Sequence, residues 1–223
     1  GVGDAVGVYM YKYGEQLSDA SVYEKSVNCK YITDANGGMS PDTDLDKLYY
    51  PLSENVSFIA YYPFGNVENY SVYLDVRQQN NPSMIDFLYS DNIENVVATT
   101  TVQQLTFAHQ LSKVLFDIKA GSGISETELD GVTVSVRNAT SNANFSLVDG
   151  SITLGTQKQE MKLPVTYSEA IAHAKGIMIP QSCDKISFII SLQSGKSFFY
   201  ALEENSQWES GKKYTYEITL TDN

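Results

Sequence analysis

The chain has 223 residues and a formal net charge of −12, from 27 acidic against 15 basic residues. A surface with this excess of negative charge repels nucleic-acid phosphates and anionic lipids, so neither is an expected partner. Hydrophobic residues make up 42% of the chain, which is enough for a sizeable core. No run approaches the roughly 18 consecutive apolar residues of a membrane-spanning helix.

Apolar residues alternate with a period of two along most of the chain, which is typical of β-strands. In the first predicted strand one face carries Val6, Val8 and Met10, and the other carries Tyr9, Tyr11 and Tyr13. Further strands are predicted over 56–62, which stops at Pro63, and over 72–77, which is followed by a polar loop.

The apolar alternation is lost between residues 92 and 104, in a polar stretch with three consecutive threonines, and it returns at Leu105. This loss predicts a domain boundary, with an N-terminal domain over 1–102 and a C-terminal domain over 103–223. Soon afterwards the apolar phase changes from odd positions, such as Phe107, to even positions, such as Val114. The change predicts a bulge or corner between His109 and Lys113.

The second half continues with regularly spaced strands over 132–136, 177–179, 186–192, 198–202 and 214–220. Asp149-Gly150 predicts a two-residue hairpin turn in which Leu147 faces Ile152, because this dipeptide tolerates positive φ angles. The alanine-rich stretch Ser168–Lys175 predicts one or two helical turns. The predicted fold is therefore all-β, with two β-sandwich domains of the transthyretin-like or Greek-key type and very little helix.

The motifs of hydrolases, nucleotide-binding proteins and metalloproteases do not occur in the sequence. The two histidines, His109 and His173, stand apart from any nucleophile or acid pattern, so we expect structural roles for them and no enzyme activity or cofactor. Cys29 and Cys183 have neither CxxC nor His-paired spacing. They are interpreted as two small buried thiols, and their redox state is left open.

Three aspartates, Asp42, Asp44 and Asp46, alternate as the first ligands of a calcium-binding loop would. Such a loop needs glycine at its sixth position and glutamate at its twelfth, where this chain has Lys47 and Ser53. The pattern therefore favours a solvated acidic loop over a metal site.

The tyrosines Tyr9, Tyr11 and Tyr13 share one face of the first predicted strand. Rows of tyrosine can stack on sugar rings or anchor a protein partner, so these residues are a candidate adhesive or partner surface. The alternative is ordinary strand packing with hydroxyl groups at the rim.

Five short motifs follow one another in an order that resembles the fimbrillin-like (Mfa-like, type V) pilin family of Bacteroides-type bacteria. They are Phe58–Pro63, Asp86–Tyr89, Leu105–Phe116, Ile177–Gln181 and Gly211–Leu220. The opening Gly3–Tyr9 also resembles the early strand of that family, so the resemblance covers nearly the whole chain.

The resemblance implies a structural or tip subunit of a cell-surface fimbrium that mediates adhesion. Members of this family are exported as lipoprotein precursors to the outer membrane, trimmed at the N-terminus, and polymerised when a strand of a neighbour fills a groove. The implied partners are other pilin subunits and a surface glycan or protein. The alternative is a monomeric surface glycan-binding lipoprotein module that uses exposed tyrosines.

The last recognisable strand ends at Leu220, three residues before the end of the sequence. Shaft-type members of the family continue into a further strand. We therefore expect this chain to accept a donor strand but not to give one, as a subunit at a pilus tip would, and trimming of the chain is the competing explanation.

Overall fold

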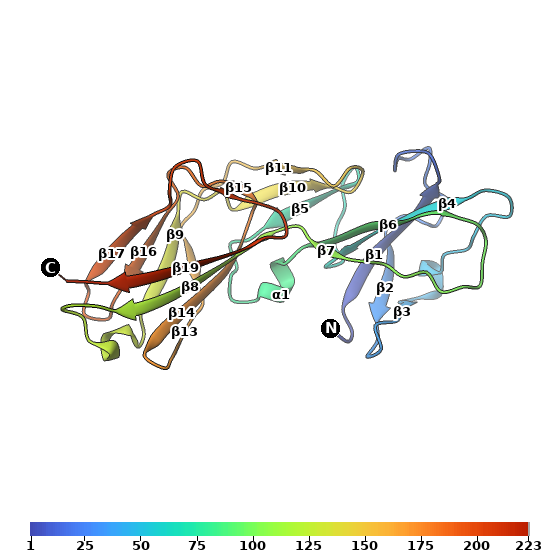
Figure 1. Cartoon of the computed structure of the whole chain (residues 1–223). Helices are drawn as coiled ribbons and strands as arrows, with labels where there is room; N and C mark the ends of the chain where they lie inside the picture. The colour runs from blue at the N-terminus through green and yellow to red at the C-terminus, as the bar shows by residue number, and fades with distance from the viewer. Residues whose placement is uncertain (223) are drawn as a thin grey trace. The chain divides into compact units, whose positions relative to one another are not determined.

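The structure, a computed structural model, describes residues 1–222. It confirms the all-β prediction, because nearly all regular structure in these residues is strand (Figure 1). The helical segments described are α1 (Pro82–Ile85) and two short 3-10 turns, η1 (Asp44–Asp46) and η2 (Glu126–Leu129).

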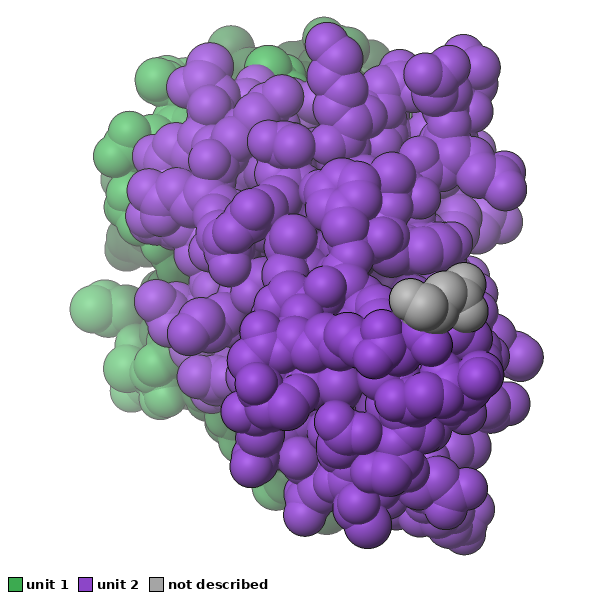
Figure 2. Space-filling view, turned by 90° about the vertical axis from the view of Figure 1, so that its left-hand side faces the viewer, with its two compact units in different colours: residues 1–73, 86–110, 144–153 green, residues 74–85, 111–143, 154–223 purple. Residues whose placement is uncertain are grey.

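The chain folds into two compact units, coloured separately in Figure 2. Unit 1 contains residues 1–73, 86–110 and 144–153, and unit 2 contains residues 74–85, 111–143 and 154–223. The expected boundary between 102 and 103 is therefore corrected, since the chain passes between the units at several points. Leu105 and Phe107 lie beyond that boundary but pack on the unit 1 cluster of Val6, Val8 and Ala60.

Unit 1 contains a six-stranded sheet with the order β3-β2-β1-β4-β6-β7. Its strands are β1 (Ala5–Lys12), β2 (Cys29–Thr33), β3 (Met39–Pro41), β4 (Val56–Tyr62), β6 (Leu88–Val96) and β7 (Ala108–His109). Strand β1 is buried on both faces, since Val8 and Tyr9 point to opposite sides and both are less than 5% exposed.

On the Tyr9 side of this sheet the core is aromatic. Phe87 lies between Tyr61, with ring centroids 6.0 Å apart, and Phe145, with centroids 4.8 Å apart. The Tyr89 ring also packs on Phe145, and its hydroxyl donates a hydrogen bond to the carbonyl of Leu147 at 3.0 Å. The segment 144–153 therefore covers this face with a well-packed layer.

A three-stranded sheet has the order β11-β10-β5, from β5 (Ser71–Asp75), β10 (Asn142–Ser146) and β11 (Ile152–Leu154). The β10–β11 hairpin was expected, but its turn is wider than the two residues predicted. The amide of Ser146 donates to the carbonyl of Ser151, so the loop spans 147–150 and only Gly150 within it has a positive φ. Leu147 is thereby released from the strand and is fully buried.

Unit 2 contains two four-stranded sheets, β12-β9-β16-β17 and β13-β14-β8-β19, and a short β15–β18 pair (Figure 1). The strands are β8 (Ser112–Ala120), β9 (Thr133–Arg137), β12 (Met161–Leu163), β13 (Val165–Ser168), β14 (Ile171–Met178), β15 (Gln181–Ser182), β16 (Ser187–Ser191), β17 (Ser197–Ala201), β18 (Gln207–Trp208) and β19 (Lys213–Leu220). The sheets meet at Phe116 and Phe188, whose ring centroids are 4.4 Å apart, as in a β-sandwich.

The predicted helix over Ser168–Lys175 is wrong, because this stretch forms the turn and adjoining strands of the β13–β14 hairpin. Ala172 and Ala174 lie opposite Ile118 and Phe116 of β8, where small side chains leave room for the large ones. Burial in the sandwich thus overrides the helix propensity of alanine.

The phase change after Phe107 is also explained by the fold. Residues up to Gln110 belong to unit 1, and Leu111 begins the unit 2 part that carries Val114 on β8. The two apolar phases therefore face two different cores, with β7 ending at His109 and β8 starting three residues later.

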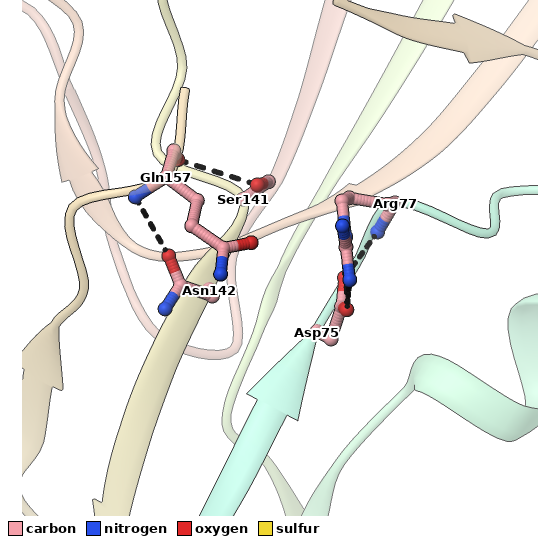
Figure 3. Close-up of polar contacts among 5 residues, drawn as sticks. All are labelled: Asp75, Arg77, Ser141, Asn142 and Gln157. Atoms are coloured by element: carbon pink, nitrogen blue, oxygen red, sulfur yellow. Dashed lines mark hydrogen bonds and ion pairs between the residues drawn. The ribbon is translucent and has the colours of Figure 1, made fainter. Parts of the chain in front are cut away.

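Polar side chains fix the start of β10 within unit 2 (Figure 3). The amide of Gln157 donates to Oδ1 of Asn142 at 3.0 Å, and the hydroxyl of Ser141 donates to the carbonyl of Gln157 at 3.2 Å. At the end of β5, Nε of Arg77 donates to the carboxylate of Asp75 at 2.9 Å. These contacts hold the irregular backbone next to the ends of β10 and β5, where the pairing between strands has stopped.

Candidate functional site

Unit 1 contains a cavity of about 860 Å³ over the Val8 face of its sheet, which we call the unit 1 groove. Its floor consists of side chains from four strands, Val8 and Met10 on β1, Tyr31 on β2, Phe58 on β4 and Ile93 on β6. The cavity is large enough for a peptide segment, since ligand pockets in proteins span about 300–1,000 Å³.

The floor is apolar because of the strand register. Met10 lies opposite Phe58, and Phe58 lies opposite Ile93, so these three side chains form one row across β1, β4 and β6. Alternate residues of a strand point to the same face, which places Val8 next to Met10 in the same layer. The sequence pattern identified this face correctly but did not show that a cavity lies over it.

The walls of the groove are irregular chain. Leu48 and Tyr50 line it from the segment after η1, and residues 101–105 and Phe107 line it from the segment between β6 and β7. We call residues 97–107 the strap. The strap contains no strand, and Val102 is 90% exposed on it.

The strap is tied to β6 through one amide side chain. Nδ2 of Asn92 donates to the carbonyl of Gln104 at 3.0 Å, and the amide of Thr106 donates to Oδ1 of Asn92 at 2.7 Å. The ladder between β6 and β7 covers only Leu88 and Tyr89. Within residues 1–222 the rest of β6 has no strand beside it on this side. The groove therefore adjoins a part of β6 that has no strand partner on this side among the described residues.

The three tyrosines of the predicted adhesive row have different environments. Tyr9 is 2% exposed and packs edge-on against Tyr70, at 5.8 Å between ring centroids. Burial raises the pKa of its phenol. Tyr11 is half-buried, and Tyr13 is 48% exposed. Tyr9 is thus corrected from a surface residue to a core residue, because both faces of β1 are covered.

The two cysteines are free thiols, and both are buried. Burial raises the pKa of the Cys29 thiol to about 11, and the nearby Asp46 carboxylate adds to the effect. Burial also raises the pKa of Cys183. Thiols held in their protonated form are poor nucleophiles, so both act as small apolar side chains.

Each histidine pairs with a carboxylate. Nδ1 of His109 lies 3.0 Å from Oδ1 of Asp86, and Nδ1 of His173 lies 2.7 Å from Oδ1 of Asp117 on the neighbouring strand. Both imidazoles are more than a third exposed. These are exposed side-chain contacts, and even fully charged pairs at such exposed positions contribute only about 0–1 kcal/mol to stability.

The three aspartates of the loop at 42–46 contact different partners. Asp42 pairs with Lys30 at 3.0 Å, and Asp44 pairs with Lys47 at 2.6 Å. Asp46 accepts hydrogen bonds from Thr43 and from the amide of Lys30, which lower the pKa of its carboxyl group. Within residues 1–222, no group of three or more His, Cys, Asp or Glu side chains could hold a metal ion.

None of the helices described within residues 1–222 has the length and apolar character required to cross a membrane. The described structure consists of two β-units, one of which has an apolar groove walled by irregular chain.

Comparison with known proteins agrees with this architecture. "Putative fimbrium subunit Fim1C" of Bacteroides uniformis is 29% identical over 238 residues, which cover 98% of this chain and 73% of the relative. A crystal structure of a "putative cell adhesion protein" from Bacteroides uniformis superposes with a TM-score of 0.82 at 26% identity, covering 99% of this chain and 88% of the other. One from Bacteroides ovatus has a TM-score of 0.76 at 17% identity, covering 99% and 83%.

The family model described as "Fimbrillin-like" matches residues 1–223. This match covers every motif on which the resemblance in the sequence was based. The chain therefore belongs to the fimbrillin-like family.

Proposed function

We propose that this chain is a subunit of a cell-surface fimbrium, and that its unit 1 groove accepts a strand from a neighbouring subunit. The observation that carries the proposal is an apolar sheet face, with Met10, Phe58 and Ile93 in one row, walled by irregular chain. A β-strand suits this shape because every second side chain points to the same side. Its backbone can pair with a free sheet edge such as that of β6.

The energetics favour a donor with alternating apolar residues. Each Val, Leu or Ile side chain that becomes fully buried contributes about 1.5–3 kcal/mol. Several such residues are needed, because association costs about 4–15 kcal/mol in lost freedom. A donor strand therefore has to bring several apolar side chains to the groove.

The proposal includes the location and the partners. The subunit is exported as a lipoprotein precursor to the outer membrane, and its partners are other pilin subunits. Support comes from membership of the fimbrillin-like family and from the fimbrial name of the Bacteroides uniformis relative. An acceptor groove serves a shaft subunit and a tip subunit alike.

We also propose that Tyr11 and Tyr13 belong to an adhesive surface. Tyr13 is the more exposed of the two. The same residues would serve the alternative function, a monomeric glycan-binding module. Burial of Tyr9 speaks against a platform of three tyrosines. Glycan-array binding of the wild type and of Tyr13→Ala tests this role, and equal binding by both proteins would exclude Tyr13.

The acceptor role is tested with a synthetic peptide that carries Val or Ile at every second position. At a peptide concentration of about 100 times Kd, binding adds about 2.7 kcal/mol and should raise Tm by about 5–10 °C. The same peptide with a scrambled sequence should raise it far less. A Tm that responds equally to both peptides contradicts the proposal.

Two arginine variants test whether the peptide binds in the unit 1 groove. Met39 lines the groove and is half-buried on a short edge strand, so Met39→Arg should obstruct the groove and remove the Tm shift. Leu52→Arg introduces the same charge at a fully exposed position outside the lining and should preserve the shift. A shift that survives Met39→Arg locates the peptide elsewhere.

A further inference from the structure

The two large sheets of unit 2 end in four edge strands, β12, β17, β13 and β19. Proteins protect edges against pairing with other chains by placing charges on them, lysine above all. Strand β12 carries Lys162, and β19 carries Lys213 and Glu217. Strand β13, Val165–Ser168, and the longer strand β17, Ser197–Ala201, have no charged residue and no proline. Strand β17 also has an unbroken register with β16 over all five of its residues. It therefore lacks these protections.

The backbone of β17 faces outward at three residues. Beyond the two ends of the β16–β17 ladder, the amide of Leu192 donates to the carbonyl of Lys196, and the amide of Leu202 donates to the carbonyl of Ile186. In an antiparallel ladder the bonded residues alternate, so Phe198 and Tyr200 bond to β16. The amides and carbonyls of residues 197, 199 and 201 point to the free edge.

The middle residue of this edge is an exposed phenylalanine. Phe199 is 67% exposed, whereas Phe198 and Tyr200 on the other face of the strand are half-buried. Phe199 lies opposite Ile189, which is also only partly buried, so the outer face of the sheet is apolar here. An apolar side chain and free backbone groups thus occur at the same place.

We propose that β17 pairs antiparallel with β17 of a second copy of this chain, with Phe199 at the twofold axis. The segment Ser-Phe-Phe-Tyr-Ala is nearly symmetric about Phe199. In this register Phe199 faces Phe199 of the second copy, and Ser197 faces its Ala201. Both pairs use the outward backbone groups, and each pair of residues exchanges two hydrogen bonds.

The charges that flank β17 favour the antiparallel arrangement. Glu203 and Glu204 follow Leu202 after the end of the strand, whereas Lys196, which precedes it, already pairs with Asp222 of its own copy. Antiparallel pairing keeps the acidic ends of the two copies apart, whereas parallel pairing brings Glu203 and Glu204 of both copies together. A second copy is therefore favoured over an unrelated strand, since the edge is nearly symmetric about Phe199 and an antiparallel copy keeps the like charges apart.

A five-residue edge buries less than the roughly 1,200 Å² of a stable interface, so the isolated dimer should be weak. In a fimbrium the same contact would repeat along the fibre, and repetition strengthens binding without new contacts. Pairing of β17 would then join fibres side by side. This last step rests on the proposed function, whereas the dimer does not.

The dimer is tested by sedimentation velocity from about 5 µM to 1 mM, a range suited to weak association. The wild type should show a sedimentation coefficient that rises with concentration. Phe199→Lys should stay monomeric, because it places like charges at the axis. Met84→Lys, at an exposed apolar residue of α1 in the same unit, should behave as the wild type. A monomeric wild type, or a dimer unaffected by Phe199→Lys, overturns the proposal.

Disulfide trapping tests the register while retaining Phe199. Mixed at high concentration under mild oxidation, Ser197→Cys and Ala201→Cys should form a heterotypic disulfide, since paired residues lie about 4.5–5.5 Å apart between Cα atoms. Neither variant should cross-link alone, because copies of one position lie about 13 Å apart. Cross-linking of Ser197→Cys alone, or no heterotypic product, contradicts the register. The peptide test of the groove is independent of this outcome.

Discussion

The side-chain amide of Gln79 pairs with the backbone of Ile177 as a neighbouring strand would. Its Oε1 accepts the amide of Ile177 at 2.9 Å, and its Nε2 donates to the carbonyl of Ile177 at 2.8 Å. Strand β13 pairs with β14 only from Ile171 to Ala174, so Ile177 lies beyond the end of that ladder. One glutamine thereby satisfies backbone groups that would otherwise be buried without partners.

Replacing Gln79 by methionine should destabilise unit 2. The change keeps the side-chain length but leaves the amide and the carbonyl of Ile177 unpaired, at a cost of about 1–3 kcal/mol for each group. Gln78→Met, at the exposed neighbouring position, is the matched control and should cost less than about 0.5 kcal/mol. Urea unfolding measures both, and equal midpoints for the two variants would contradict this role of Gln79.

Gly7 should not tolerate a larger residue. A Cβ atom at Gly7 would clash with the ring of Tyr61, which is fully buried and donates a hydrogen bond to Oδ1 of Asn28 at 2.7 Å. Gly7→Ala should therefore cost about 1–3 kcal/mol from overpacking. A Cβ at Gly65 meets nothing within 4 Å, so Gly65→Ala should be nearly neutral. Thermal unfolding distinguishes the two, and a neutral Gly7→Ala would show that the ring of Tyr61 can move.

The stability of unit 1 should fall at alkaline pH. Burial raises the pKa of Tyr9, Tyr61 and Tyr89 above the usual value near 10. Above that pH the unfolded chain loses phenolic protons that the folded chain retains, so the free energy of unfolding decreases by up to about 1.4 kcal/mol per pH unit for each group. The stabilisation that comes from these raised pKa values is fully present below about pH 10, and it is lost as the pH rises through the pKa values of the phenols in the folded protein.

Tyr89→Phe tests this linkage. The variant loses the hydrogen bond to Leu147, which should cost about 1 kcal/mol at neutral pH, but it also removes one titrating phenol. Its stability should therefore decline less steeply than that of the wild type between pH 10 and 11.5. Urea unfolding at several pH values gives the two slopes, and parallel slopes would mean that Tyr89 does not contribute to the alkaline loss.

The β13–β14 turn should become more stable with glycine. Glu169 and Ala170 have φ angles of 52° and 61°, the left-handed conformation of a type I′ turn, which side chains with a Cβ adopt at a cost. Ala170→Gly should raise the free energy of unfolding by up to about 1 kcal/mol. Ala174→Gly, within strand β14, should lower it instead, and an effect of the same sign at both positions would contradict the turn assignment.

The sequence pattern predicted most strands because their apolar faces alternate regularly. It failed at Ser168–Lys175, where the alanines that lie opposite Ile118 and Phe116 give the segment a composition typical of a helix. It also placed the domain boundary in the strap, where polar residues cover part of a groove within unit 1. The more reliable signal was the phase change between Phe107 and Val114, which coincides with a passage between the units.

The groove could be predicted only in part. Alternation on β1 and β4 identified the apolar floor, but a cavity depends on which loops cover that floor, and loop paths depend on long-range contacts such as that of Asn92 with Gln104. Tyr9 was assigned to a surface because alternation does not show that both faces of β1 are covered. The Gln79 contact with Ile177 spans 98 residues and has no local signal.

Strand acceptance in assembled fimbriae is tested most directly by photo-cross-linking. Tyr50 lines the unit 1 groove, whereas its neighbour Tyr49 is 74% exposed and lies outside the lining. Each is replaced in turn by p-benzoylphenylalanine, and cross-linked subunits are mapped by mass spectrometry. The account predicts cross-links from position 50, but not from position 49, to a β-strand of a neighbouring subunit. Cross-links that reach only the same chain from position 50 would contradict it.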